Sequence, residues 1–215
     1  MNPSHALPTL YLSSRRRLAR LRELAFYFAA QDHRDDWQAR LAYCTVELAN
    51  RWSVFCRSYY LSAVFGCTTA RRSTVTCSVG RLSYNDALGQ AVLKYRPRAV
   101  PKDDGSWHRR DEPTWHDPTV FTTLMAHVGS ENSIDVQHAF STGTRTFIDL
   151  PVFRNFFAHR NFQSMRAAQS IGRQYGIPVT LPPSEILRRR PIGRPQALLL
   201  DWIDDVRFTM EYLCT

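Results

Sequence analysis

Three side chains of the types needed for phosphoryl transfer lie close together in FRNFFAHRNF, residues 153–162. A histidine has an unperturbed pKa of about 6.5, so His159 can accept and donate protons near neutral pH. Arg154 is permanently charged and can bind two phosphate oxygens at once. RNA can be cut without a metal when its 2′-OH attacks the adjacent phosphorus, which requires a proton carrier and a cation. Arg154 and His159 are therefore candidate catalytic residues, and Asn155 is a candidate for orienting the imidazole or binding a phosphate oxygen.

The spacing of these residues on a helix argues for a site shared by two chains. Proline suits the first helical position, so we predict a helix from Pro151 to about Tyr175 with the motif in its first turns. Asn155 and His159 share a face, whereas Arg154 projects about 140° away from His159 on an ideal helix. Two copies about a two-fold axis can bring each arginine towards the other chain's histidine. The apolar stripe predicted to dock this helix consists of Phe153, Phe156 and Phe157.

Similar spacing occurs elsewhere in the chain, where Arg109 and Arg110 precede His116. With arginine this frequent, a few such pairs are expected by chance. The second group lies in a stretch interrupted by prolines, whereas Arg154 and His159 lie in a strongly apolar predicted helix. Helical context, rather than spacing, therefore selects Arg154 and His159.

The sequence RNFFAH, with Arg154 followed by a polar residue and His159 five positions later, resembles the R-x4–6-H motif of the HEPN superfamily. Members are helical bundles, and many are metal-independent endoribonucleases whose site forms across a homodimer. The resemblance implies RNA products with a 2′,3′-cyclic phosphate and a 5′-OH. It also implies a bacterial toxin or antiviral-defence effector, held in check by an antitoxin or sensor protein. Some members lack the catalytic pair, so a non-catalytic adaptor that binds RNA or protein is the alternative.

The remainder of the chain is predicted to be mostly helical. Apolar residues recur at three- and four-residue spacing in several segments, and Ser13 and Asp117–Pro118 are suited to helix starts. The helices are expected at 13–30, 35–65 (one helix or two joined by a kink), 84–95, 117–129, 133–140 and 197–213. We predict an all-α, HEPN-like bundle in a single domain over residues 1–215. An irregular insertion between about residues 66 and 117 contains a β-branched stretch and a loop rich in proline, tryptophan and charge.

Glu47 is a candidate supporting residue, because a carboxylate in an otherwise apolar helix usually has a cation as its partner. That partner is Arg154 or Arg160 if Glu47 belongs to the site. The alternative is a structural pair with Arg51, four residues on along the helix.

The insertion carries candidate RNA-binding residues. Trp107 and Trp115 can stack on unpaired bases, while Arg109 and Arg110 hold phosphates. A dimerisation or partner-binding loop is the alternative. His108 and His116 have acidic residues nearby, as a metal site would require, but they lack the spacing of a known metal motif. We predict neither a metal nor a cofactor.

Two further basic segments have open interpretations. Arg188, Arg189 and Arg190 form a run inside a proline-rich connection, where a solvated linker and a phosphate contact are both reasonable. One face of the first predicted helix, from Arg15 to Arg22, is either solvated or in contact with RNA.

The composition favours a polyanionic partner and an intracellular setting. The formal charge is +9, and the basic residues are nearly all arginines, since Lys94 and Lys102 are the only lysines. Arginine binds phosphate and stacks on bases, although genome composition also produces this bias. The five cysteines show no CxxC spacing, which is typical of a reducing compartment. Without a signal region or a long apolar stretch, the chain is predicted to be cytoplasmic and free of the membrane.

Overall fold

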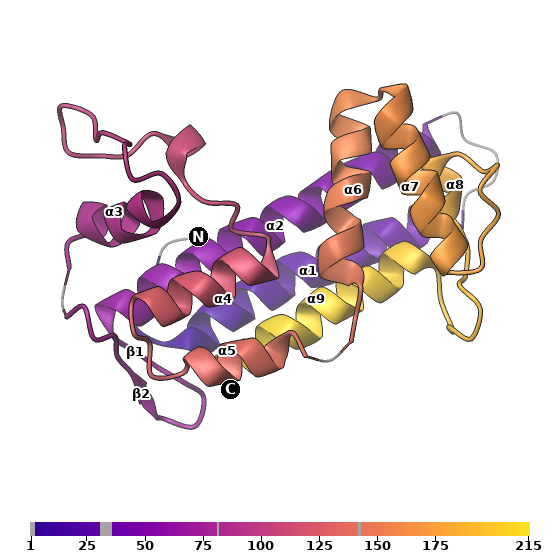
Figure 1. The fold of residues 1–215 in the computed structure, drawn as a ribbon. Coiled ribbons are helices and arrows are strands. Elements are labelled where there is room, and N and C mark those ends of the chain that lie inside the picture. The colour runs from indigo at the N-terminus through magenta and orange to yellow at the C-terminus, as the bar shows by residue number, and fades with distance from the viewer. Residues whose placement is uncertain (1–2, 31–35, 81, 142) are drawn as a thin grey trace. The chain divides into compact units, whose positions relative to one another are not determined.

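A computed structural model describes residues 3–30, 36–80, 82–141 and 143–215, and most of them are helical (Figure 1). The α-helices are α1 (Leu7–Ala29), α2 (Trp37–Phe65), α3 (Tyr84–Tyr95), α4 (Pro118–His127), α5 (Ser133–Ala139), α6 (Thr146–His159), α7 (Phe162–Gln174), α8 (Pro183–Arg188) and α9 (Leu198–Cys214). A short 3-10 helix, η1, spans Arg109–Asp111. Strands β1 (Cys67–Thr68) and β2 (Thr74–Val75) pair antiparallel. The all-α class is confirmed, with this two-stranded pair as the one sheet of the described residues.

The chain divides into two compact units, each built from segments that are distant in the sequence. The first contains residues 1–14, 52–143 and 209–215, and the second contains residues 15–51 and 144–208. Helices α1, α2 and α9 contribute residues to both units. A single cut in the sequence therefore cannot separate the units.

An aromatic cluster forms the core of the first unit. Trp52 stacks on Phe55 in α2, with ring centroids 5.8 Å apart. Tyr59, one turn further on, meets the edge of Phe121 from α4 at 5.7 Å. The hydroxyl of Tyr59 accepts a hydrogen bond of 2.6 Å from Asn132, just before α5. Large rings on one face of α2 thus fix α4 and α5 against it.

In the second half of the predicted insertion, the buried carboxylate of Glu112 fixes the chain through hydrogen bonds. The side chain of Glu112, 5% exposed, accepts hydrogen bonds from Arg57 (2.7 Å) and from the indole of Trp115 (2.7 Å). Burial alone would raise the pKa of the Glu112 carboxyl, but these bonds and the charges of Arg57 and Arg109 lower the pKa below its ordinary value. This network ties the loop after α3 to α2.

Local signals place the starts of α3 and α4 correctly. Ser83 caps α3 by accepting from the backbone of Asp86, and Asp117 caps α4, which begins at Pro118. Both helices match the predicted positions.

Three helix boundaries differ from prediction. Helix α1 starts at Leu7 because its buried stripe begins there, and Ser14 lies inside the helix, where its hydroxyl donates to Leu10 O. Helix α2 is continuous from Trp37; Asp35, the predicted start, lies outside the described residues. The predicted 151–175 helix is two helices, α6 and α7.

Loss of the Glu112 charge should destabilise the protein. The change Glu112→Gln leaves Arg57, 15% exposed, without its counter-charge, so we expect a free energy of unfolding lower by about 3 kcal/mol at pH 7. Because the folded-state pKa is lowered, this contribution is complete above the ordinary pKa of about 4.5 and is lost as pH falls through the folded value. Urea unfolding from pH 7 to pH 3 measures it.

The control is Glu211→Gln, an exposed glutamate of the same unit, which should change stability by less than about 0.5 kcal/mol. An equal effect of the two substitutions, or a difference that does not shrink in acid, would show that the Glu112 network does not stabilise the fold.

Candidate functional site on α6 and α7

Helix α6 is held in the second unit by the buried side chain of Asp149. Its carboxylate accepts hydrogen bonds from Arg145 (3.2 and 3.3 Å) on the same helix and from the Tyr175 hydroxyl (2.8 Å) at the end of α7. The indole of Trp202 on α9 donates to the same hydroxyl at 3.3 Å. Burial raises the pKa of Tyr175, so its hydroxyl keeps its proton and remains a donor.

One turn further on, packing continues through Phe153. Its side chain is fully buried and meets the edge of the Trp202 ring, with centroids 5.2 Å apart. Phe156 and Phe157 are only half-buried and contact each other at 5.0 Å. The predicted docking stripe is therefore confirmed for Phe153 and only partial for the other two phenylalanines.

The helix ends at His159, and the chain turns back at once into α7. Arg160 adopts a left-handed conformation, with φ 48° and ψ 34°. Asn161 caps α7 by accepting from the backbone N–H of Ser164 at 2.8 Å. Figure 1 shows α6 and α7 as adjacent antiparallel helices joined by this tight turn. The motif thus lies in the last turns of α6, at the tip of a helical hairpin, and its predicted place in the first turns of a helix is wrong.

The three predicted catalytic residues lie on the surface of this tip. Asn155 and His159 are exposed, and Arg154 is half-exposed. The guanidinium of Arg154 donates to the Asn155 side-chain oxygen at 3.3 Å. Arg154 and His159 are five residues apart, which separates them by about 7.5 Å along the helix axis as well as around it.

Arg154, Arg160 and His159 are among the cations that have no ion-pair partner within the residues that the structure describes. The arginines that do form ion pairs with aspartate or glutamate are Arg22, Arg40, Arg51, Arg57, Arg96, Arg109, Arg145, Arg188, Arg189 and Arg207. The positive charge at the hairpin tip is therefore available to an anion.

An uninterrupted stripe of accessible side chains runs along α6 to the motif. Ile148 is 63% exposed, and Val152, Asn155 and His159 follow it at helical spacing on the same face. Exposed Ala158 lies about 60° from Asn155, between it and Arg154. Small residues at such a position let another helix approach closely.

Phe162 and Arg166 add a feature that the sequence reasoning missed. Phe162, the first residue of α7, is 62% exposed, and the Arg166 guanidinium lies 4.4 Å from its ring centroid. An exposed ring stacked with a cation is a surface on which a base can stack. The four-residue spacing of Phe162 and Arg166 indicates this contact once the helix is known to start at Phe162.

Glu47 pairs with Arg51, with 2.5 Å between carboxylate oxygen and guanidinium nitrogen. This is the structural alternative weighed above, and Glu47 is not bound to Arg154 or Arg160. The reason is local: the two side chains are one helical turn apart on α2.

The two tryptophans predicted to stack on RNA bases instead make contacts within the protein. Trp115 is 2% exposed and packs on Tyr60, with ring centroids 5.3 Å apart, so its predicted stacking role is wrong. Trp107 is half-buried against Gly89 and donates its indole N–H to Asn85 O at 2.9 Å. Of the adjacent arginines, Arg109 pairs with Glu112 and Arg110 is exposed.

The arginine run after residue 187 is partly structural. Arg188 ends the short helix α8, pairs with Glu185 at 2.7 Å and lies over the Trp37 ring at 4.7 Å. Arg189 and Arg190 are exposed. The segment is therefore not a solvated linker throughout.

Histidine, cysteine and acidic side chains do not gather into a possible metal site anywhere in the described ranges, including the surroundings of His108 and His116. All five cysteines carry free thiols. Burial raises the pKa of the Cys44 and Cys67 thiols to about 12, which suppresses the reactive thiolate. The described helices include none long and apolar enough to span a membrane.

Comparison with known proteins gives no match: no protein-family profile fits the sequence, and neither the curated proteins nor the solved structures include a similar one.

The free energy of unfolding should distinguish the buried residue Phe153 from the surface residues Arg154 and His159 of α6. Phe153→Ala removes a fully buried ring and should lower the free energy of unfolding by about 3–5 kcal/mol. Arg154→Ala and His159→Ala should each change it by less than about 0.5 kcal/mol, because both side chains are accessible. Denaturant unfolding of the three variants is the measurement. A loss for His159→Ala as large as that for Phe153→Ala would mark the histidine as structural.

Proposed function

We propose that the protein is a metal-independent endoribonuclease that acts as a homodimer through Arg154, Asn155 and His159. The observation that carries the proposal is the presence of two cationic side chains and an imidazole, all accessible and without ion-pair partners, at the tip of the α6–α7 hairpin. The motif's resemblance to HEPN ribonucleases supports the same conclusion.

The chemistry assigned to these residues is an internal transesterification. His159 takes the proton of the 2′-OH as that oxygen attacks the adjacent phosphorus, and Arg154 stabilises the charge on the phosphorane oxygens. The bond to the 5′-oxygen then breaks, and the imidazolium returns a proton to that leaving oxygen. The products are a 2′,3′-cyclic phosphate and a 5′-OH. DNA has no 2′-OH and is not a substrate.

A second chain completes this site. Within one α6, Arg154 and His159 differ by about 140° in direction, so each needs its counterpart from another copy. Two α6 helices can pair antiparallel about a two-fold axis that passes between Phe156 and Phe157. Arg154 of one chain then lies level with the partner's His159. These two rings are half-buried in one chain, which suits a position covered on dimerisation. Ala158 lets the two backbones approach.

By the same resemblance, the activity is that of a toxin or antiviral-defence effector. A cell that makes an unspecific ribonuclease must restrain it, so an antitoxin or sensor protein is the partner that we propose alongside RNA.

Cleavage in the presence of EDTA tests the reaction. A labelled single-stranded RNA should be cut to products with a 2′,3′-cyclic phosphate, and the DNA of the same sequence should remain intact. His159→Ala and Arg154→Ala should each abolish cleavage. The matched controls are His138→Ala and Arg173→Ala, which should cut normally. RNA binding without cleavage in wild type and variants alike would instead indicate the non-catalytic adaptor.

Mixing the two inactive variants tests the composite site. In a heterodimer of Arg154→Ala with His159→Ala, one site receives both wild-type residues and the other receives neither. Half of randomly formed dimers are mixed, so about one quarter of wild-type activity should return. No recovery, with subunit exchange verified by sedimentation or mass spectrometry, would place both residues of a site on one chain.

The dimer itself should depend on the small side chain at the centre of the exposed face. Ala158→Arg adds bulk and a like charge where two α6 helices are proposed to meet, so we expect monomer at micromolar concentration and no cleavage. Because Ala158 is exposed, the monomeric variant should keep the helical circular dichroism spectrum of the wild type. Ala167→Arg, at an exposed alanine of α7, is the control and should remain dimeric. Retained dimerisation of Ala158→Arg by sedimentation would exclude this contact.

A further inference from the structure

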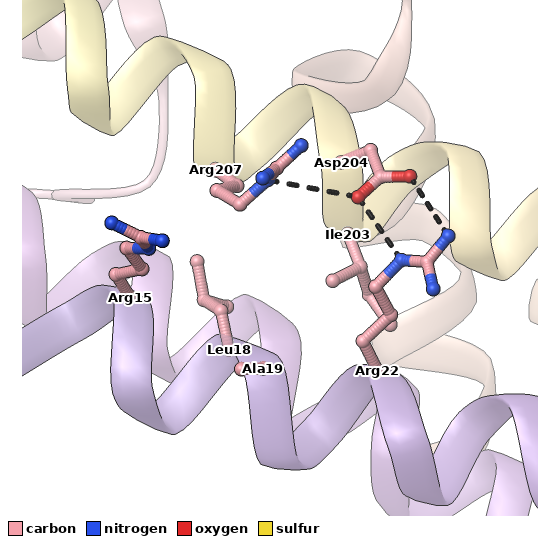
Figure 2. A pocket seen from close by; sticks show the side chains of 7 residues that line it. All are labelled: Arg15, Leu18, Ala19, Arg22, Ile203, Asp204 and Arg207. Atoms are coloured by element: carbon pink, nitrogen blue, oxygen red, sulfur yellow. Dashed lines mark hydrogen bonds and ion pairs between the residues drawn. The ribbon is translucent and has the colours of Figure 1, made fainter.

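A hollow of about 330 Å³ lies between α1 and α9 in the second unit (Figure 2). Its apolar lining is formed by Leu18, Ala19 and Ile203. In Figure 2, Arg15 and Arg22 rise from α1 on either side of Leu18 and Ala19, and Arg207 and Asp204 face them from α9. Three guanidiniums thus border a cavity that has one lining carboxylate.

That carboxylate is committed to one of the three arginines. Asp204 accepts two hydrogen bonds from Arg22, at 3.1 and 3.3 Å, through both of its oxygens. Gln196 donates to Asp204 at 2.8 Å and accepts from Arg22 at 2.8 Å. The closed triangle holds Arg22 in place and leaves little of the Asp204 charge for the other cations.

Arg207 and Arg15 remain without an equivalent partner. The Nε of Arg207 lies 3.7 Å from Asp204, beyond hydrogen-bond distance. This nitrogen is out of contact with solvent and has no hydrogen-bond acceptor among the described residues. Arg15 forms no ion pair with any residue in the described ranges. A buried donor without an acceptor is costly, so Arg207 is incompletely satisfied within the fold. Its side chain is 35% exposed, so an anion in the hollow would contact the accessible part of the guanidinium rather than this nitrogen.

We propose that this hollow binds a phosphate group. The unpaired guanidinium of Arg15 and that of Arg207, which shares the Asp204 carboxylate with Arg22, attract the charge of a phosphate monoester, about −1.5 to −2 at pH 7. The cavity lies at the lower end of the size range of small-molecule sites, about 300–1,000 Å³, so it admits the phosphate with part of the attached group. Ala19, the exposed apolar residue of the lining, provides an apolar contact for that group. This site does not depend on the ribonuclease proposal.

Binding of three probes tests the site and identifies the source of the phosphate. Inorganic phosphate, adenosine 5′-monophosphate and an uncleavable 2′-O-methyl RNA tetranucleotide without terminal phosphates would be titrated calorimetrically at 0.15 M salt. The double variant Arg15→Gln/Arg207→Gln should weaken binding about tenfold or more, because it removes two charge-assisted donors. The control Arg16→Gln/Arg20→Gln removes the same charge from exposed positions of α1 outside the hollow and should change binding less than about twofold.

If binding is weakened in Arg15→Gln/Arg207→Gln but not in the control variant, the proposal is supported, whichever probe is affected. If the weakening affects phosphate or the mononucleotide, the ligand is a small phosphorylated molecule, and if it affects only the tetranucleotide, the ligand is an RNA backbone. Equal weakening by the hollow and control variants, or no binding of any probe to wild type, would overturn the proposal. Circular dichroism melts of both double variants verify that the fold is retained.

Discussion

The placement of α6 depends on the buried carboxylate of Asp149. It lies on the core side of the helix and is hydrogen-bonded by Arg145 and by the hydroxyl of Tyr175, which in turn accepts from Trp202. A buried charge is stable only when its acceptors are filled, so this network permits one rotation of α6 about its axis. With Asp149 and Phe153 turned inward, Asn155 and His159 must face outward. The accessibility of the motif is thus a consequence of a contact two turns away from it.

Charge pairing divides the arginines of the chain into two groups. Several ion-paired arginines serve the fold: Arg57 is bound to Glu112, Arg145 to Asp149 and Arg188 to Glu185. The net charge of +9 is therefore carried by the cations outside these pairs, since an ion pair contributes no net charge. In the second unit these include Arg154 and Arg160 at the hairpin tip and the exposed Arg15, Arg16 and Arg20 along α1. Total composition indicated a polyanionic partner, but only the structure shows which arginines are free to bind one.

The sequence predicts those parts of the fold that local chemistry determines. The starts of α3 and α4 follow from Ser83 and Asp117, each of which caps its own helix within a few residues. The break between α6 and α7 was missed because Arg160 adopts a left-handed conformation that sequence reasoning assigns to glycine. The only local sign is Asn161, which caps α7 through Ser164.

The same difference between local and long-range contacts applies to the candidate site residues. Arg154, Asn155 and His159 were identified from one short stretch, and their exposure is seen in the structure. The stacking role predicted for Trp115 is wrong because its indole is bonded to Glu112, which in turn binds Arg57, 55 residues before Glu112 in the sequence. The hollow joins Arg22 to Asp204 across 182 residues. Such contacts leave no pattern in a single sequence, so a site built from them cannot be predicted from the sequence.

The two proposed sites differ in what one chain can provide. In the hollow, Asp204 and Gln196 fix Arg22, and Arg207 lies beside Asp204 with its Nε buried, so the α9 side of the site is held by the fold before any ligand binds. Such a site is complete in a monomer. At the hairpin tip, Arg154 is bound only to its neighbour Asn155, and the direction of His159 diverges from it. Catalysis there needs a second chain to bring the groups together. Dilution should therefore separate the two activities: cleavage should fall with the dimer fraction, whereas phosphate binding per chain should stay constant. A parallel decline of both in one dilution series would mean that the hollow, too, is formed only in the dimer.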